Sequence, residues 1–177
     1  NKIINHNTFW LSKNPEKVGS QLWYSLYPRI CTTAIVELEN GDKVRVYNTH
    51  LDCFLPQARD FGLKKLAQFI DKNRKKEKLP VIVMGDFNAN PNSKVIKKFA
   101  AGEYNTDRFV AVQEVKKELY KKSTMSGFKG IEKGLHIDYI FVSEDLEIVD
   151  VDIIKDNENG KYPSDHYPLI ADIILKK

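Results

Sequence analysis

Stretches rich in β-branched and apolar residues alternate along the chain with segments of helical periodicity. Residues 31–38 and 44–49 are predicted strands, joined by Asn40-Gly41, a dipeptide suited to a tight hairpin turn. Residues 81–84 are continuously apolar, as in a short strand that is buried on both faces. Three further strands are predicted over residues 137–142, 148–154 and 167–175.

Helical periodicity is clearest over residues 57–78. An apolar stripe is formed there by Leu63, Leu66, Ala67 and Ile70. The last turns are rich in lysine and arginine, which oppose the negative end of the helix macrodipole, so we favour this structural role over nucleic-acid binding. A short helix is expected from Ser93, as its cap, to Phe99. Residues 113–121 are a weaker helical segment, and residues 125–134 are expected to form a loop.

The strands outnumber the helices, and their apolar side chains point to both faces. This pattern predicts an α/β (α+β) fold, a layered α-β-β-α sandwich of two packed, mostly antiparallel sheets with outer helices. The 177 residues are expected to form a single domain, 1–177. The chain opens with Asn1, so any targeting segment would lie upstream. The sequence is of a soluble type, and its compartment, cytoplasmic or secreted, stays unknown.

Charge and cysteine content narrow the choice of function only slightly. Lysine and arginine number 28 and aspartate and glutamate 24, a net charge of +4. This excess is compatible with an anionic substrate, but a dedicated nucleic-acid binder would usually carry a stronger basic stripe. Cys31 and Cys53 have neither the spacing of a zinc site nor that of a disulfide framework, so both are expected to be free thiols.

Polar residues gather at the ends of four predicted strands, which is typical of a site built on a rigid scaffold. The four clusters are Asn48-Thr49-His50-Leu51-Asp52, Gly85-Asp86-Phe87-Asn88, His136-Ile137-Asp138-Tyr139 and Ser164-Asp165-His166-Tyr167-Pro168. Each cluster alone has an ordinary explanation, such as a turn after a strand, a surface pair or a satisfied buried carboxylate. The recurrence of the same chemical types at successive strand ends favours a shared site.

The chemistry of these clusters points to phosphate-ester hydrolysis. They contain histidines, carboxylates and carboxamides, without a cysteine ligand, a glycine-rich phosphate loop or a G-x-S-x-G hydrolase pattern. Hard oxygen ligands favour Mg²⁺, Mn²⁺ or Ca²⁺ over zinc. A divalent cation beside histidine and aspartate suits attack on phosphorus by water.

Four motifs in this order resemble the endonuclease/exonuclease/phosphatase superfamily of metal-dependent, deoxyribonuclease-like phosphoesterases. Thr49-His50-Leu51 resembles the T-H-L element of that family, and Gly85-Asp86-Phe87-Asn88 matches its G-D-F-N element. Ile137-Asp138-Tyr139-Ile140 resembles I-D-Y-I, and Ser164-Asp165-His166 matches the terminal S-D-H. With a similar segment at Thr8-Phe9-Trp10-Leu11-Ser12, the resemblance covers residues 8–175.

The resemblance implies catalytic roles for five residues. His166 would polarise the scissile phosphate or act as the general base, and Asp138 would hydrogen-bond His166 and raise its pKa. Asp86 would orient or deprotonate the attacking water, and Asn88 would position that water or bind a phosphate oxygen of the substrate. His50 would donate a hydrogen bond to a non-bridging oxygen and stabilise the charge that develops there.

The resemblance also implies a metal site, for which Asp165 is the ligand candidate and Mg²⁺ the expected ion, with Mn²⁺ or Ca²⁺ as alternatives. Arg29 could bind a substrate phosphate, and a structural salt bridge is an equal alternative. The family carries an Asn on its first strand and a metal-binding Glu soon after. Nothing between Asn1 and Arg29 fits those motifs, and Glu16 is not assigned to them. We therefore expect the C-terminal two-thirds, roughly, of a family domain, incomplete at its N-terminus and able to self-associate through exposed sheet edges.

The sequence thus predicts metal-dependent hydrolysis of a phosphate ester by a phosphodiesterase, nuclease or phosphatase, with water activated at Asp86 and His166. The alternative is a catalytically inactive fragment or binding module that keeps the family fold. The substrate could be nucleic acid, a phospholipid headgroup, an inositol phosphate or another phosphate ester.

Several neighbours of the motifs receive lesser roles. Asp52 is expected to order the turn after His50, and His136 is expected at the surface. Trp10, Trp23 and Tyr24 could form a stacking platform for a base or lipid, although packing in the core or at its rim is the simpler interpretation.

Overall fold

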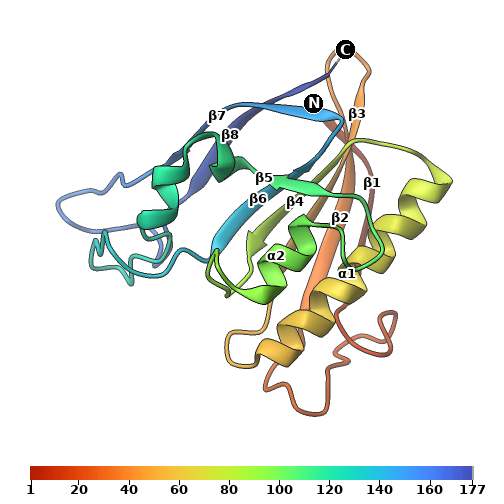
Figure 1. Ribbon diagram of the computed structural model, residues 1–177, viewed down its shortest axis with the longest axis horizontal. Helices are drawn as coiled ribbons and strands as arrows, with labels where there is room; N and C mark the ends of the chain where they lie inside the picture. The colour runs from red at the N-terminus through yellow and green to blue at the C-terminus, as the bar shows by residue number, and fades with distance from the viewer. Residues whose placement is uncertain (177) are drawn as a thin grey trace.

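A computed structural model describes residues 1–176 of the chain, which form eight strands, two α-helices and two short 3₁₀-helices (Figure 1). The strands are β1 (Lys2–Trp10), β2 (Ile30–Glu37), β3 (Lys43–His50), β4 (Val81–Asp86), β5 (Phe109–Ala111), β6 (Asp138–Ser143), β7 (Leu146–Ile153) and β8 (Leu169–Leu175). The helices are α1 (Pro56–Lys76), α2 (Lys94–Ala100), η1 (Val112–Val115) and η2 (Lys117–Lys121).

Six of the strands form one sheet in the order β1-β2-β3-β4-β6-β5, and β7 pairs with β8 in a second sheet. Only β3 and β4 run parallel, because the long helix α1 connects them and carries the chain back along the sheet. Every other pairing in the described part of the chain is antiparallel. The predicted mixed α/β fold with two mostly antiparallel sheets is therefore confirmed.

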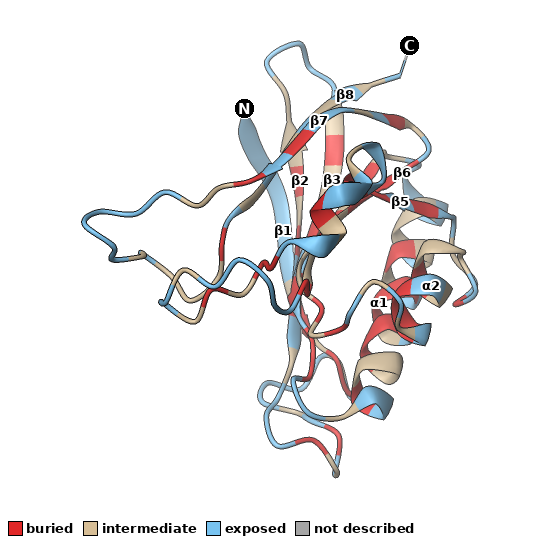
Figure 2. Ribbon diagram, turned by 60° about the vertical axis from the view of Figure 1, so that its left-hand side comes forward, coloured by how far each residue is buried: buried red, intermediate tan, exposed pale blue. Residues whose placement is uncertain are grey.

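The larger sheet lies between two apolar layers. Helices α1 and α2 cover one of its faces, and the β7–β8 sheet lies on the opposite side together with η1 (Figure 2). The core on the helix side includes Phe87, Phe99 and Phe141, which are fully buried and pack ring against ring. The core on the other side contains Val142 of the large sheet and Val151 of β7. Both faces of the larger sheet are therefore partly buried, as its apolar strands require.

Helix α1 follows the predicted pattern closely. Leu63, Leu66 and Ile70 are fully buried on the face that meets the sheet. Among the basic residues near its end, Arg74 is largely buried and pairs with Asp145 (Nη1–Oδ2, 3.1 Å) and with Asp107 (Nε–Oδ2, 2.6 Å). This cation has a structural role, as the sequence pattern indicated.

Two strands were not predicted, and two helical segments differ in detail. β1 is an edge strand with mostly exposed polar residues, and β5 has only three residues, so neither carries an apolar alternation. Residues 113–121 form two 3₁₀-helices instead of one α-helix. Ser93 occupies the N-cap position of α2, but its side chain makes no capping hydrogen bond, so the expected capping contact is wrong.

Two expectations about composition can be compared with the coordinates. Cys31 is buried and Cys53 is exposed, and both are free thiols as predicted. Within residues 1–176, none of the helices combines the length and the apolar character that crossing a bilayer requires.

Candidate functional site

Three of the predicted site residues lie in one row across neighbouring strands. His50 ends β3 and pairs in register with Asp86 at the end of β4, and Asp86 pairs with Asp138 at the start of β6. Side chains in register on adjacent strands are about 5 Å apart. The antiparallel direction of β6 is what brings its first residue beside the last residues of β3 and β4. The topology thus gathers three separate motifs at one end of the sheet.

His166 reaches the same place from the loop before β8. Its Nδ1 lies 2.8 Å from Oδ2 of Asp138. The loop is held by backbone hydrogen bonds, in which Ser126 N donates to the Asp165 carbonyl (2.6 Å) and Tyr167 N donates to the Thr124 carbonyl (2.8 Å). With Nδ1 directed at a carboxylate, the neutral ring would carry its proton on Nδ1, which makes Nε2 the nitrogen without a proton.

Gly85 permits the close approach of β3 and β4 immediately before Asp86. Its φ is +133°, a conformation that favours glycine. A Cβ at this position would collide with the backbone carbonyl oxygen of Thr49 on β3. The glycine of the Gly85-Asp86-Phe87-Asn88 motif is therefore required by the backbone that positions Asp86.

Asp86 is held by its neighbours on both carboxylate oxygens. The backbone N–H of Asn88 donates to Oδ1 (2.7 Å), and the Asn88 side-chain amide donates to Oδ2 (3.1 Å). Nε2 of His50 lies 3.3 Å from the same Oδ2. Asn88 has a φ of +49°, and it makes its two hydrogen bonds to Asp86 in this left-handed backbone conformation. Asn88 therefore orients the Asp86 carboxylate before any substrate arrives.

The close packing of these groups changes their pKa values. Burial alone would lower the pKa of His166, but the hydrogen bond that the ring donates to Asp138 and the charges of Asp138, Asp86 and Asp165 outweigh burial and raise it. Burial raises the pKa of Asp86 and lowers that of His50, whose pKa is lowered further by Arg29. Perturbed groups of opposite type side by side are typical of acid–base sites.

A divalent cation has donors of the appropriate kind at this end of the sheet. Asp86, Asp138 and His166 each offer one ligand atom, and these three atoms lie within 4.8 Å of one another. Two carboxylates suit a hard cation such as Mg²⁺, which keeps several waters in its coordination shell. Asp165 adjoins His166 but is not a member of this group, so its role as a metal ligand stays a prediction.

Arg29 and Asp52 lie beside the row on the loops that flank β2 and β3. Arg29 donates from Nη2 to Cys53 Sγ (3.3 Å) and has no ion pair within residues 1–176, so the structural salt bridge considered for it is absent there. Asp52 is 3% exposed, and its carboxylate accepts hydrogen bonds from the N–H groups of Phe54 and Leu55 and from the Ser25 hydroxyl. The expected role of Asp52 in ordering this turn is confirmed.

A buried polar network holds the backbone of Asp138, and most of this network was not predicted from the sequence. The Thr124 hydroxyl accepts hydrogen bonds from the N–H groups of Ile137 (3.0 Å) and Asp138 (3.2 Å). Gln113 donates to the Asp138 carbonyl (3.0 Å) and contacts His136. Thr124 and Gln113 lie 14 and 25 residues before Asp138, and no local pattern marks them.

His136 is one of these buried residues, so the expectation that it lies at the surface is wrong. It is 2% exposed, and its Nδ1 lies 3.0 Å from the Lys122 carbonyl. Because it precedes an apolar strand and supports the Asp138 segment, the core encloses it. Burial lowers its pKa, which favours the neutral ring.

A cavity of about 320 Å³ opens beside the row, lined by polar residues of the site and by the apolar start of β8. Asn48, Asp138, Ser164 and His166 contribute its polar groups. Asn48 is exposed and was not assigned a role. Trp23, considered for a stacking platform, is 87% exposed and meets Tyr24 edge to face, so the simpler packing interpretation does not hold for the Trp23 ring.

Comparison with solved structures finds the same fold in several larger proteins. A mannosyl-6-phosphatase from Bacteroides thetaiotaomicron superposes with a TM-score of 0.85 at 23% identity, over 98% of this chain and 67% of that one. An endonuclease/exonuclease/phosphatase from Bacteroides vulgatus gives 0.78 at 26%, over 99% and 66%. The human Nocturnin catalytic domain with a bound sulfate anion gives 0.72 at 21%, over 99% and 60%.

The family assignment follows from the sequence profile. The chain spans about two thirds of the length of the similar solved structures. No curated protein sequence matches it. The profile of the endonuclease/exonuclease/phosphatase family matches residues 6–166, which include the row His50–Asp86–Asp138 and also His166. The chain belongs to the endonuclease/exonuclease/phosphatase family.

Proposed function

We propose that the protein hydrolyses a phosphate ester with the help of a divalent cation, using the row His50–Asp86–Asp138 together with His166. The observation that carries this proposal is the hydrogen-bonded pair of Asp138 and His166 (2.8 Å), set beside the Asp86 carboxylate. A carboxylate that can take a proton and a ring that can give one thus face the same space. Hydrolysis of a phosphate ester needs both groups.

In the proposed reaction, a water oxygen attacks phosphorus while the ester P–O bond breaks. Asp86, held by Asn88 and His50, accepts a proton from that water. His166, whose protonated form is stabilised by Asp138, donates through Nε2 to an oxygen of the phosphoryl group. The ester oxygen leaves with a proton taken from solvent water, to which Asp86 returns the proton that it accepted, so the products are an alcohol and a phosphate with one ester bond fewer.

Asp86 and Asp138 are the proposed carboxylate ligands of the cation, with Asp165 beside them as a further ligand. Mg²⁺ is the ion we expect, and Mn²⁺ or Ca²⁺ would meet the same oxygen donors. When bound, such a cation offsets negative charge on the phosphoryl oxygens. Arg29 would add a further positive charge toward the substrate, and its charge already acts on His50, whose pKa it lowers.

The proposed substrate class is a phosphomonoester or phosphodiester of a small alcohol. The cavity of about 320 Å³ beside His166 is at the small end of the range for ligand sites. One solved structure of this fold is a mannosyl-6-phosphatase and another holds a sulfate anion, a tetrahedral oxyanion like phosphate. Nucleic acid, a phospholipid headgroup and an inositol phosphate are the larger substrates to be compared with these.

The test is hydrolysis of p-nitrophenyl phosphate and bis(p-nitrophenyl) phosphate by the intact protein, with Mg²⁺, with Mn²⁺ and with a chelator. We expect turnover that requires the cation and falls about 100-fold or more in His166→Ala. Gln68→Ala is the control, because Gln68 is an exposed polar residue on α1, outside the row and its cavity. A folded protein with no turnover of either ester and no cation binding would instead indicate the inactive binding module.

A further inference from the structure

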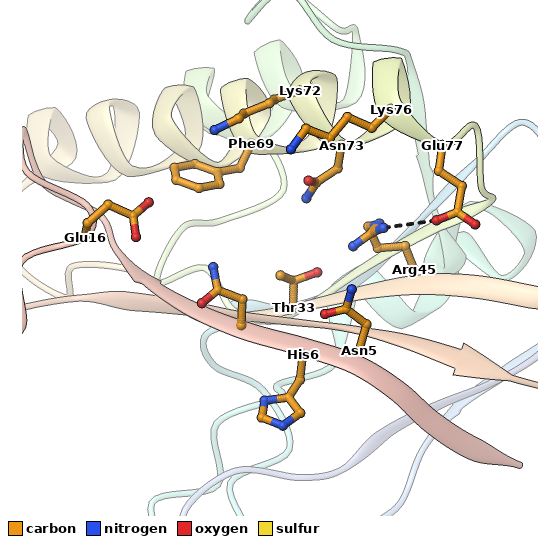
Figure 3. Close-up of a pocket in the computed structure, with 11 residues that line it drawn as sticks. Asn5, His6, Glu16, Thr33, Arg45, Phe69, Lys72, Asn73, Lys76 and Glu77 are labelled. Carbon is orange, nitrogen blue, oxygen red and sulfur yellow. Dashed lines mark ion pairs between the residues drawn. The ribbon is translucent and has the colours of Figure 1, made fainter.

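A second polar cavity lies at the opposite end of the sheet from the row His50–Asp86–Asp138. Helix α1 begins soon after His50 and runs back antiparallel to β3, so its C-terminal turns lie over the beginning of that strand. Between these turns and β1–β3 there is a cavity of about 340 Å³ (Figure 3). The residues of its lining that matter most here are Asn5, Asn7, Thr33, Arg45, Lys72 and Asn73.

The cavity exists because side chains that should pack helix against sheet are polar here. On β1, Phe9 is buried and stacks on Phe69 of α1 (ring centroids 3.8 Å apart). Two and four residues earlier, on the same face of the strand, stand Asn7 and Asn5. Beyond Phe69 the helix likewise presents Asn73 toward the sheet instead of an apolar residue, as Figure 3 shows. An inward face usually carries apolar residues, so this polar section calls for a ligand or water.

Two buried groups in the cavity lack hydrogen-bond partners. Thr33 is 5% exposed, and its hydroxyl makes no hydrogen bond of ordinary length within residues 1–176, although it lies near the Tyr47 hydroxyl of the neighbouring strand. Nε of Arg45 is likewise buried without a partner, although its Nη2 lies 3.6 Å from Glu77. Native proteins rarely leave such groups unpaired, because each one costs stability. Both groups project from the strands into the cavity (Figure 3).

The charges of the cavity favour an anion. Lys72 and Lys76 lie one helical turn apart, and neither forms an ion pair in the part of the chain that the structure describes. Like charges at this spacing disfavour the helix. By contrast, Lys75, on another face of α1, pairs with Asp71 (2.7 Å). The acidic side chains of the cavity are Glu77, which meets Arg45, and Glu16, at its far end (Figure 3).

We propose that this cavity binds a small phosphate-bearing polyol, with the phosphate between Lys72 and Lys76 and the hydroxyls at the asparagine side chains. Three cations against two carboxylates leave a net positive charge for the phosphate. Nδ2 of Asn73 already donates to the Tyr47 hydroxyl (2.8 Å), so the side-chain oxygen Oδ1 of Asn73 is left to accept from a ligand hydroxyl. The Thr33 hydroxyl and Arg45 Nε are covered by neighbouring side chains, and a small shift of these side chains would let both groups bond the ligand.

The site is tested by NMR titration of the intact protein, in the presence of a chelator, with inorganic phosphate and with glycerol 3-phosphate. The side-chain amide signals of Asn5, Asn7 and Asn73 report this cavity, and those of Asn88 report the row at the other end of the sheet. We expect the first set to shift with both ligands, more strongly with glycerol 3-phosphate. Binding seen at Asn88 alone would overturn the proposal.

Matched charge variants separate a site from a general charge effect. Lys72→Gln with Lys76→Gln should weaken glycerol 3-phosphate binding at Asn5 and Asn73 by about 10-fold or more. Lys64→Gln with Lys75→Gln removes the same charge from exposed positions of the same helix and should change glycerol 3-phosphate binding less than about twofold. Equal weakening by both pairs would contradict the proposal.

Thr33→Val gives a test that does not depend on charge. Valine keeps the shape of threonine but removes the unpartnered hydroxyl. We expect weaker glycerol 3-phosphate binding at Asn73 with an unchanged melting temperature. Unchanged binding together with a lower melting temperature would mean that the hydroxyl bonds within the fold, where Tyr47 is its cross-strand neighbour, and would contradict the proposed role.

Discussion

Polar side chains differ in their hydrogen bonding between the two ends of the six-stranded sheet. At the end that carries the row His50–Asp86–Asp138, both oxygens of Asp86 accept hydrogen bonds and the His166 ring bonds Asp138. At the other end, the Thr33 hydroxyl and Nε of Arg45 are buried, and neither makes a hydrogen bond of ordinary length within residues 1–176. Groups that hold one another are positioned before a substrate arrives, which is what catalysis requires. Unpartnered groups reduce stability until a ligand satisfies them.

The largest effect on stability is expected at Gly85, in the backbone immediately before Asp86 of the row. Gly85→Ala would place a Cβ against the Thr49 carbonyl at a φ of +133° and should lower the free energy of unfolding by about 4 kcal/mol. Gly41→Ala is the control, because Gly41 also has a positive φ (+87°) but no atom within 4 Å of the added Cβ. It should cost about 1 kcal/mol. Urea denaturation measures both, and equal losses would contradict the steric explanation.

The next effect concerns the pair of Asp138 and His166. Asp138→Asn removes the charge that stabilises the protonated ring, so phosphodiester hydrolysis should fall about 100-fold. The pKa of His166 should also decrease, because Asp138 supplies the main contributions that raise it against burial. NMR titration of the His166 ring in the presence of a chelator measures this shift. An unchanged titration would show that the pair does not act as a unit.

A matched pair of threonines compares the two ends directly. Thr124→Val removes the acceptor for two backbone N–H groups, those of Ile137 and Asp138, and should cost about 2 kcal/mol of unfolding free energy. Thr33→Val removes a buried hydroxyl that makes no hydrogen bond of ordinary length within residues 1–176, and it should leave the free energy of unfolding unchanged or raise it slightly. Both variants are measured by chemical denaturation. Similar losses would remove the proposed difference between the two ends.

The smallest effect is a dependence of stability on pH at Asp52. Burial raises the pKa of this carboxyl, but hydrogen bonds from Ser25, Leu55 and Phe54 and the Arg29 charge outweigh burial and lower it. A lowered pKa in the folded state stabilises the protein above the unfolded value, which is about 4, and this contribution is lost as the pH falls through the folded value.

Asp52→Asn should therefore be about 1 kcal/mol less stable than the wild type at pH 7, with a difference that shrinks below about pH 4. The exposed Asp156→Asn serves as the control and should show no such difference. Thermal melts of the three proteins across this pH range make the comparison. A difference that stays constant with pH would rule out ionisation of Asp52 as its cause.

How much of this structure the sequence predicts depends on whether a feature is local. The apolar alternation of β2 and β3 and the stripe on α1 are local patterns, and these elements were found within about two residues, the usual accuracy for element boundaries. The motif order pointed to His50, Asp86, Asp138 and His166, which the sheet register and the loop before β8 bring together.

Features that depend on long-range packing were not visible in the sequence. β1 forms because β2 offers it an edge, and its own residues have little apolar pattern. His136 resembles a surface histidine until Gln113 and the Lys122 carbonyl, both distant in sequence, enclose it. The cavity between α1 and β1 depends on where the helix lies across the sheet, which no segment specifies alone.

The most direct test of the proposed site is kcat/KM for bis(p-nitrophenyl) phosphate at saturating Mg²⁺, for the wild type and for Asp86→Asn. Asparagine keeps the shape of aspartate but cannot accept the proton of water or offer a charged ligand. We predict a decrease of about 100-fold or more with an unchanged melting temperature. A folded Asp86→Asn protein that hydrolyses the diester as fast as the wild type would contradict hydrolysis at this end of the sheet.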